Sequence, residues 1–121
     1  MNDVISPTTK DVIENHIQRF RNGDIEGILD DYAPDAMLFT PVGVLKGRSE
    51  IKPLFQAMLA EFGKPDSSET VRTAIFEGNY AYLVWSGQTA DNVYEFATDT
   101  FFLRDGKILF QSFAAKISPK R

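Results

Sequence analysis

Apolar residues near the start of the chain recur at the spacing of an amphipathic helix. Between positions 12 and 20, apolar side chains and one histidine follow one another at intervals of three and four residues, until Asn22-Gly23 interrupts them. Ser6 offers an N-cap for this segment, and Pro7 suits its first turn. The pattern predicts a first helix that ends before Gly23.

A second, shorter helix is predicted to follow Asp24, which can act as its N-cap, and to end before Pro34. Its apolar face consists of Ile25, Ile28, Leu29 and Tyr32. Residues 36–40 and 44–46 are then typical of two short strands on either side of the turn "TPVG".

The third predicted helix has the clearest apolar stripe in the sequence. Ser49 can cap its first turn, and Gly63 and Pro65 end it. Pro53 falls in the expected first turn, where its missing N–H group costs little. The stripe is formed by Ile51, Leu54, Phe55, Met58, Leu59 and Phe62.

After Pro65 the pattern changes to four long strands that form two hairpins, with turns at "EGN" and "RDG". The predicted strands cover residues 69–76, 80–90, 93–103 and 107–117. Helices followed by hairpins indicate an α+β fold, a single domain over residues 1–121 with three N-terminal helices packed on an antiparallel sheet. A sheet that curves strongly around the helices leaves a cone-shaped cavity, which the first and third helices close.

The last strands are apolar on both faces. Phe96 and Phe102 have one parity along their strand, and Phe101 and Leu103 have the other. One face meets the helices, and a second subunit is the simplest cover for the other. We therefore expect a homodimer that forms through the outer face of the sheet.

Composition excludes several classes of function. The net charge is −4, and basic residues gather only in the C-terminal "KISPKR", which argues against a nucleic-acid partner. The chain has no Cys, which excludes thiolate catalysis and Cys-ligated metals. There is no Gly-rich phosphate motif, and Lys46 and Arg48 fit a strand-to-helix turn better than an anion site. No signal peptide and no membrane-spanning stretch are visible, so we expect a cytoplasmic protein with no membrane partner.

The order of these segments resembles a known superfamily. The stretch "NGDIEGILDDYAPDAMLFTPVG", then "GRSEI", then two long hairpins is similar to the nuclear transport factor 2-like superfamily, and within it to ketosteroid isomerases and SnoaL-like polyketide cyclases. The resemblance extends from Lys10 to about Lys116. It implies the cone-shaped, cystatin-like fold more specifically than a reaction, because this fold hosts enzymes and non-catalytic binders.

The resemblance also points to three positions. The oxyanion pair of a ketosteroid isomerase, a tyrosine and a neutral aspartic acid, falls at His16 and Asp99, and its proton-moving carboxylate falls at Thr40. A threonine hydroxyl is no base near neutral pH unless it is activated, so Thr40 argues against steroid isomerisation. Its hydroxyl can orient a substrate oxygen, or its β-branched side chain simply suits the extended backbone before Pro41; we favour the structural interpretation.

His16 and Asp99 each have two interpretations. His16 is a buried histidine with one hydrogen-bond partner, or it lies on the cavity wall; as the only histidine it cannot build an ordinary metal site. Asp99 points outward to solvent beside Thr98 and Thr100, or inward to the cavity. With both inward, an imidazolium–carboxylate pair would keep Asp99 ionised. Asp99 would then be the general acid/base, and His16 its partner or the oxyanion donor, as in SnoaL-like cyclases.

The alternation of side chains along each strand and the apolar face of each helix predict which residues surround the cavity. Any single one of these residues can instead be an ordinary core residue. They are Phe20, Tyr32, Phe39, Phe55, Met58, Leu59, Phe62, Tyr82, Val84, Ser86, Phe101, Gln111 and Phe113, with Thr40 at the mouth. Leu83 and Trp85 have the opposite parity from Val84 and are expected to face the dimer partner. Asp30, Asp31 and Asp35 are expected on a solvated acidic surface.

These features together predict a cofactor-independent, metal-free enzyme of the isomerase, cyclase or lyase type. It would move a proton next to the carbonyl of a small apolar compound. Two alternatives remain at this point. One is a non-catalytic binder with the same pocket, and the other is a dimerising module whose own Phe side chains fill the cavity.

Overall fold

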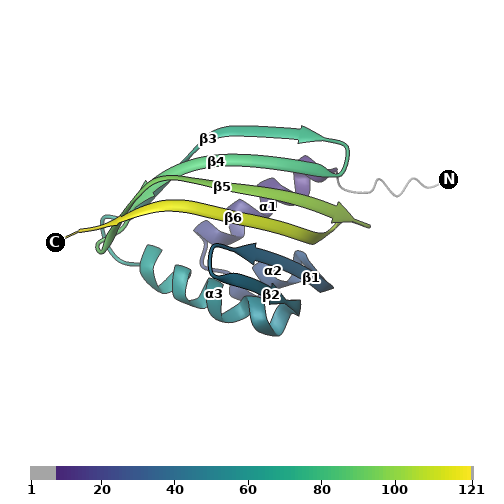
Figure 1. Cartoon of the computed structure of the whole chain (residues 1–121), viewed down its shortest axis with the longest axis horizontal. Coiled ribbons are helices and arrows are strands. Elements are labelled where there is room, and N and C mark those ends of the chain that lie inside the picture. The colour runs from purple at the N-terminus through teal and green to yellow at the C-terminus, as the bar shows by residue number, and fades with distance from the viewer. Residues whose placement is uncertain (1–7, 121) are drawn as a thin grey trace.

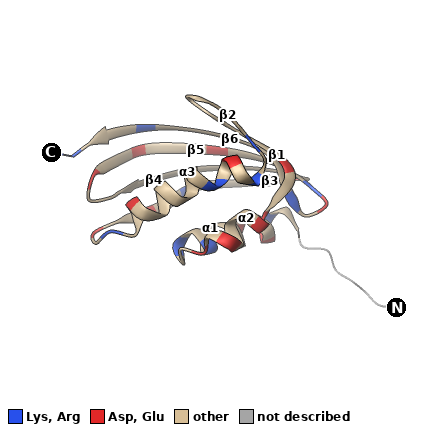
Figure 2. Ribbon diagram, turned by 90° about the horizontal axis from the view of Figure 1, so that it is seen from below, with Lys and Arg blue, Asp and Glu red and all other residues tan. Residues whose placement is uncertain are grey.

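The computed structural model describes residues 8–120, which form three helices and six strands (Figure 1). The helices lie on one face of a curved sheet (Figure 2), and this α+β arrangement agrees with the sequence prediction. The elements are α1 (Thr9–Arg21), α2 (Ile25–Asp30), β1 (Tyr32–Thr40), β2 (Gly43–Lys46), α3 (Gly47–Phe62), β3 (Ser68–Glu77), β4 (Tyr80–Gln88), β5 (Asn92–Arg104) and β6 (Lys107–Pro119).

The sheet is mixed rather than antiparallel throughout. Its strand order is β2-β1-β6-β5-β4-β3, and β1 pairs with β6 in parallel. The two long hairpins and the β1–β2 hairpin are antiparallel, as expected. The expectation was wrong for β1 and β6 because local patterns reveal hairpins, whereas this pair joins segments far apart in the sequence.

The ends of α1 and α2 follow from local capping. Thr8 caps α1, because its hydroxyl accepts the Asp11 N–H at 3.1 Å while the Asp11 carboxylate accepts the Thr8 N–H at 3.2 Å. The predicted Ser6-Pro7 start lies outside the described residues. Asp24 caps α2 as predicted, but α2 ends at Asp30 and not at Pro34.

Tyr32 and Pro34 belong to β1, not to the second helix. The register between β1 and β6 shifts between Tyr32 and Met37, and an irregularity of this kind tolerates a proline that cannot donate a ladder hydrogen bond. Tyr32 therefore enters the core from the sheet.

α3 begins earlier than the predicted cap at Ser49. Gly47, with a φ of 79°, turns the chain directly from β2 into the helix. The Lys46 N–H donates to the Glu50 carboxylate at 2.7 Å, and Ser49 makes no capping bond. Pro53 consequently lies within the helix rather than in its first turn. The helix ends at Phe62 before Gly63, as predicted.

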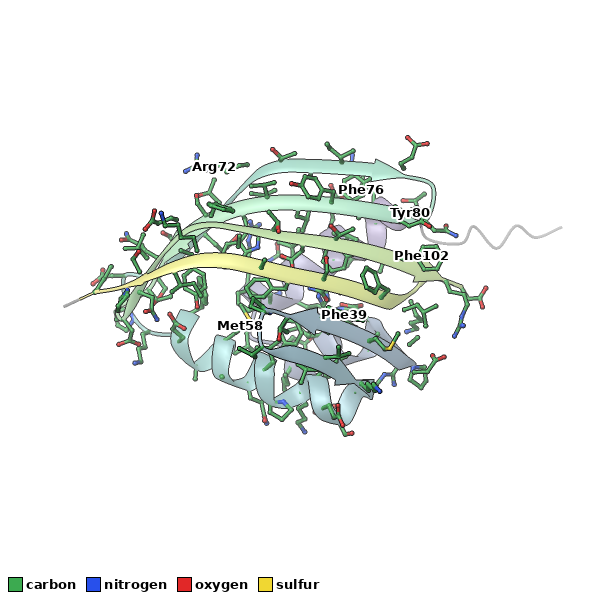
Figure 3. The ribbon with its side chains drawn as sticks, viewed as in Figure 1. Phe39, Met58, Arg72, Phe76, Tyr80 and Phe102 are labelled. Atoms are coloured by element: carbon green, nitrogen blue, oxygen red, sulfur yellow. The ribbon has the colours of Figure 1, made fainter. Side chains whose placement is uncertain are left out.

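The core fills the concave side of the sheet. Its fully buried members come from all three helices and from the central strands, and they include Ile13, Ile28, Tyr32, Leu38, Ile51, Phe101 and Ile108. The helices cover only this face, so the convex face keeps aromatic side chains in solvent. Phe39, Tyr80 and Phe102 lie on it in Figure 3. The homodimer through this face stays a prediction.

Within residues 8–120, no helix is both long enough and apolar enough to cross a membrane. The cytoplasmic location likewise stays a prediction.

Candidate active site

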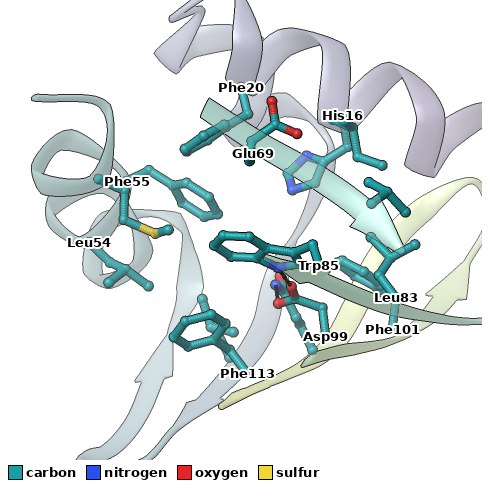
Figure 4. Close-up of a pocket in the computed structure, with 15 residues that line it drawn as sticks. His16, Phe20, Leu54, Phe55, Glu69, Leu83, Trp85, Asp99, Phe101 and Phe113 are labelled. Atoms are coloured by element: carbon teal, nitrogen blue, oxygen red, sulfur yellow. Dashed lines mark hydrogen bonds between the residues drawn. The ribbon is translucent and has the colours of Figure 1, made fainter. Parts of the chain in front are cut away.

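A cavity of about 100 Å³ lies between α1, α3 and the concave face of the sheet (Figure 4). Apolar side chains form most of its wall, and the polar groups there are His16, Glu69, Asp99, Gln111 and the indole of Trp85. The apolar lining consists of Ile17, Phe20, Leu38, Leu54, Phe55, Met58, Val71, Leu83, Phe101 and Phe113.

Asp99 points into this cavity from β5. It stands in register with Leu83 of β4 and Phe113 of β6, so all three share the concave face. Only 7% of Asp99 is exposed. Its Oδ1 accepts the Gln111 Nε2–H at 2.8 Å, and its Oδ2 accepts the Trp85 Nε1–H at 2.9 Å. The structure thus places Asp99 inward, which is the second of the two orientations expected from the sequence.

The surroundings of Asp99 act on its pKa in opposite directions. Burial raises the pKa of the carboxyl group, because the charged form loses its hydration. The hydrogen bonds from Trp85 and Gln111, and then the charge of His16, lower it, but burial prevails and the net pKa is raised. Asp99 is therefore a better proton acceptor than a solvent-exposed aspartate, which suits a general acid/base.

His16 lines the same cavity from α1, but it does not contact Asp99 by a hydrogen bond. Its Nδ1 lies 2.8 Å from Asp31 Oδ2, and its Nε2 lies 3.4 Å from the Tyr32 hydroxyl. Arg19 pairs with the other oxygen of Asp31. The expected imidazolium–carboxylate pair of His16 and Asp99 is wrong, because α2 ends directly beside His16 and supplies Asp31 as a nearer partner.

Asp31 also departs from the expected acidic surface, since it is only 5% exposed. Asp30 and Asp35 do lie on the surface, where they pair with Lys107 and Arg104 respectively. The sequence alone did not show which of the three aspartates is buried, because Asp31 differs from the other two only in its contacts with His16 and Arg19 of α1.

Tyr32 and Gln111 connect His16 to Asp99. The Tyr32 hydroxyl donates to Gln111 Oε1, and Gln111 Nε2 donates to Asp99. Burial, then the charges of Asp99 and Asp31, raise the pKa of Tyr32 well above its ordinary value, so the phenol stays protonated and can donate.

The described residues supply no obvious metal site, since no three His, Asp or Glu side chains in positions 8–120 converge.

Residues 13–110 match the model of the SnoaL-like domain. The chain belongs to the SnoaL-like family. Among solved structures, it is similar to an NTF2-like protein of unknown function from Cytophaga hutchinsonii (15% identity, TM-score 0.74, 96% of this chain and 95% of that chain covered). It is also similar to a "putative ketosteroid isomerase" from Kribbella flavida (15% identity, TM-score 0.74, 93% of this chain and 81% of that chain covered). A third similar structure is a "putative polyketide cyclase" from Sinorhizobium meliloti (16% identity, TM-score 0.70, 85% of this chain and 93% of that chain covered). No curated protein matches the chain. The nuclear transport factor 2-like fold implied by the resemblance is thereby confirmed.

In this SnoaL-like domain, some of the residues expected around the cavity do line it: Phe20, Phe55, Met58, Phe101, Gln111 and Phe113. Tyr32 lies fully buried behind the wall, bonded to Gln111. Leu59 and Phe62 line an adjacent groove on the α1 side, together with Phe20 and Glu69.

The side chains of β4 that face the cavity are not the ones expected from the sequence. Tyr82, Val84 and Ser86 are not part of the cavity lining, whereas Leu83 and Trp85, which were expected at the dimer interface, are. A bulge explains the reversal, because the β4–β5 register shifts between the pairs Gly87–Tyr94 and Trp85–Ala97. A one-residue slip moves every side chain to the other face of a strand.

The β1 residues Phe39 and Thr40 also lie away from the cavity. Phe39 is 40% exposed and packs on Phe110, with ring centroids 5.5 Å apart. The Thr40 hydroxyl donates to Gly43 O at 2.9 Å and accepts from Val42 N–H at 3.3 Å, which closes the β1–β2 turn. This geometry supports the structural interpretation of Thr40.

Glu69 was missed by sequence reasoning. It stands on β3 at the edge of the cavity, where its two carboxylate oxygens accept from Arg21 Nε and Nη2, each at 2.9 Å. The only signal available was its position near the start of the predicted strand.

Proposed function

We propose that this SnoaL-like domain is a cofactor-independent enzyme that moves a proton next to a carbonyl group of a small apolar compound. The observation that carries the proposal is Asp99, a buried carboxyl group with a raised pKa, held by two side-chain donors in an otherwise apolar cavity. Family membership and the similarity in fold to the isomerase-like and cyclase-like structures support an enzyme acting on small molecules.

The proposed step uses the oxygens of Asp99 as the base. Asp99 takes the proton from the carbon beside the carbonyl, and the electron pair of the broken C–H bond moves onto the carbonyl oxygen. We assign His16 to that oxygen, because its ring lines the cavity and its Nε2 makes only a long contact, 3.4 Å, with the Tyr32 hydroxyl, whereas its Nδ1–H is committed to Asp31. Asp99 then returns the proton to the same or another carbon, which regenerates the carboxylate.

The cavity also restricts the ligand. A volume of about 100 Å³ is below the range of about 300–1,000 Å³ usual for drug-sized ligands. A ligand larger than a single ring therefore requires side chains at the mouth to move. Of the two carboxylates on the wall, Glu69 is paired with Arg21, and Asp99 disfavours an anion close to its oxygens. An uncharged cyclic ketone or enone fits these conditions best.

Solvent exchange tests the proposal without knowledge of the natural substrate. Small cyclic ketones and enones are incubated with the protein in D₂O, and NMR follows deuterium uptake at the carbon beside the carbonyl. The wild type is expected to accelerate uptake, and Asp99→Asn to lose about 10²-fold or more of that acceleration. Tyr94→Phe, which removes a hydroxyl bonded to Glu61 rather than to Asp99, is the control and should retain it. Equal acceleration by wild type and Asp99→Asn would refute the role of Asp99.

Binding without turnover is the second candidate, and the position of Thr40 favours it. The sequence resemblance to ketosteroid isomerases assigns their proton-moving carboxylate to the position of Thr40, and here Thr40 closes a surface turn. A ketone that raises the melting temperature while its exchange rate stays at the uncatalysed level would identify a binder.

A further inference from the structure

Asp99 is the end of a hydrogen-bonded chain that runs along the closed side of the cavity. The chain passes, in order, through Arg19, Asp31, His16, Tyr32, Gln111 and Asp99. Its members come from α1, β1, β5, β6 and the end of α2, and all except Arg19 are buried. Two of them, Tyr32 and Gln111, have no part in the proposed chemical step.

Donors and acceptors determine the direction of this chain. The Asp31 carboxylate only accepts, so His16 Nδ1 carries a hydrogen. The Tyr32 hydroxyl gives its hydrogen to Gln111 Oε1, and its oxygen is thereby left to accept from His16 Nε2–H. Gln111 can then turn only its Nε2–H groups to Asp99. With His16 protonated on both nitrogens, every donor from His16 Nε2 onward points toward Asp99, and the ionised carboxylate is favoured.

The same side chains can hold the opposite arrangement. When His16 Nε2 carries no hydrogen, Tyr32 can donate to it and accept from the Gln111 Nε2–H. The carboxamide of Gln111 is then reversed and presents Oε1 to Asp99, which is satisfied only if Asp99 carries a proton. Mixed arrangements leave a buried donor or acceptor without a partner, which costs free energy.

We propose that Tyr32 and Gln111 are positioning residues that couple the charge of Asp99 to the charge of His16, with the Gln111 carboxamide reversing as the coupling element. Tyr32, which links His16 to Gln111, lies behind the cavity wall, so this coupling is present with or without a ligand. It does not depend on turnover.

The other charged groups around the chain are themselves paired. Glu69 faces the cavity from β3 and is held by Arg21, and Asp31 is held by Arg19. The raised pKa of Asp99 supports the proposal, because it makes the neutral form accessible.

The sequence provides a reporter at each end of the chain. Trp85 is the only tryptophan, and its Nε1–H donates to Asp99 Oδ2, so its indole N–H resonance reports the charge of Asp99. His16 is the only histidine, and its ring resonances report its own protonation. NMR titration from about pH 4 to about pH 9 follows both groups in one sample. In the wild type we expect each resonance to register both transitions, because coupled sites titrate together.

Tyr32→Phe breaks the chain and keeps the shape of the side chain. It should raise the midpoint reported by Trp85 by at least about half a pH unit, because Gln111 is no longer held as a donor to Asp99. Tyr94→Phe is the matched control. Its ring stacks on Trp85 with centroids 5.5 Å apart, so it should move the indole resonance but leave the midpoint unchanged. Asp99→Asn must abolish the transition, and Glu69→Gln must leave it in place.

His16→Gln removes the charge at the far end of the chain, and part of its effect on Asp99 is the direct electrostatic effect of that charge. It too should raise the midpoint, and a thermal unfolding curve shows whether each variant is folded. If Tyr32→Phe does not fold, Tyr32→Met, which also removes the hydroxyl, takes its place. The proposal is overturned if the folded variants keep the wild-type midpoint, or if the wild-type indole resonance shows no transition that Asp99→Asn removes.

Discussion

At the scale of single residues, the position of Asp99 suits proton transfer and works against stability. Burial raises its pKa above the value in the unfolded chain, so between these two values the folded state binds the proton more tightly. The contribution of Asp99 to stability is therefore greatest in acid, and it is lost as the pH rises through the folded-state pKa.

The direction of this pH dependence gives a prediction for the unfolding free energy of an Asp99 variant. Relative to the wild type, Asp99→Asn should become steadily more stable as the pH is raised, by about 1.4 kcal/mol for each unit of pKa elevation. Urea unfolding at several values between about pH 4 and about pH 8 measures the difference. Asp105→Asn, in the exposed β5–β6 turn, controls for the loss of one negative charge. A stability difference that does not change with pH would contradict the assignment of a raised pKa to Asp99.

The sequence indicated that His16 and Asp99 share one cavity, and the structure places both in its lining, but their hydrogen-bond partners were not predictable. His16 stands out as the single histidine on an apolar helix face, and Asp99 as a carboxylate within an apolar strand. Their connection through Tyr32 and Gln111 depends on a parallel pairing of β1 with β6, and no local pattern encodes that pairing.

At the scale of elements, the presence of the hairpins and helices was largely predictable from the sequence. The face to which the β4 side chains point and the residue at which α3 begins were not. The "RDG" turn appears as the β5–β6 hairpin, because Asp105 and Gly106 adopt the positive φ values that such a turn requires. The faces of β4 were assigned wrongly because one extra residue in β5 changes the register. A bulge leaves no clear signal in an apolar strand.

The start of α3 offers a direct comparison of sequence and structure. Gly47→Ala should lower the unfolding free energy by about 1 kcal/mol, because a side chain is strained at a φ of 79°. Ser49→Ala should cost almost nothing, because Ser49 makes no capping bond. Chemical denaturation of both variants measures the two effects. A larger loss of stability for Ser49→Ala than for Gly47→Ala would show that Ser49 caps the helix after all.

At the scale of the whole molecule, the helices leave one face of the sheet uncovered. Tyr82 is 39% exposed and Phe96 is 50% exposed on strands whose other faces are buried. The aromatic pairs Phe39–Phe110 and Tyr80–Phe102 extend this surface. Burial of such a surface against a second copy remains the simplest way to remove it from water.

The dimer is testable by light scattering coupled to size-exclusion chromatography. We expect twice the mass of one chain for the wild type and the mass of a single chain for Tyr82→Glu, because burying an unpaired charge at the interface is costly. Val42→Glu, at the fully exposed tip of the β1–β2 turn, is the control and should remain dimeric. A wild type that is monomeric at micromolar concentration would contradict the expectation.

The pH dependence of deuterium uptake into a ketone tests most directly whether Asp99 moves the proton. The catalysed rate should rise with pH along the same curve, and with the same midpoint, as the Trp85 indole resonance that reports ionisation of Asp99. In Tyr32→Phe both midpoints should move together. A rate that follows a different midpoint, or that is unaffected while the indole resonance titrates, would show that another group carries the chemistry.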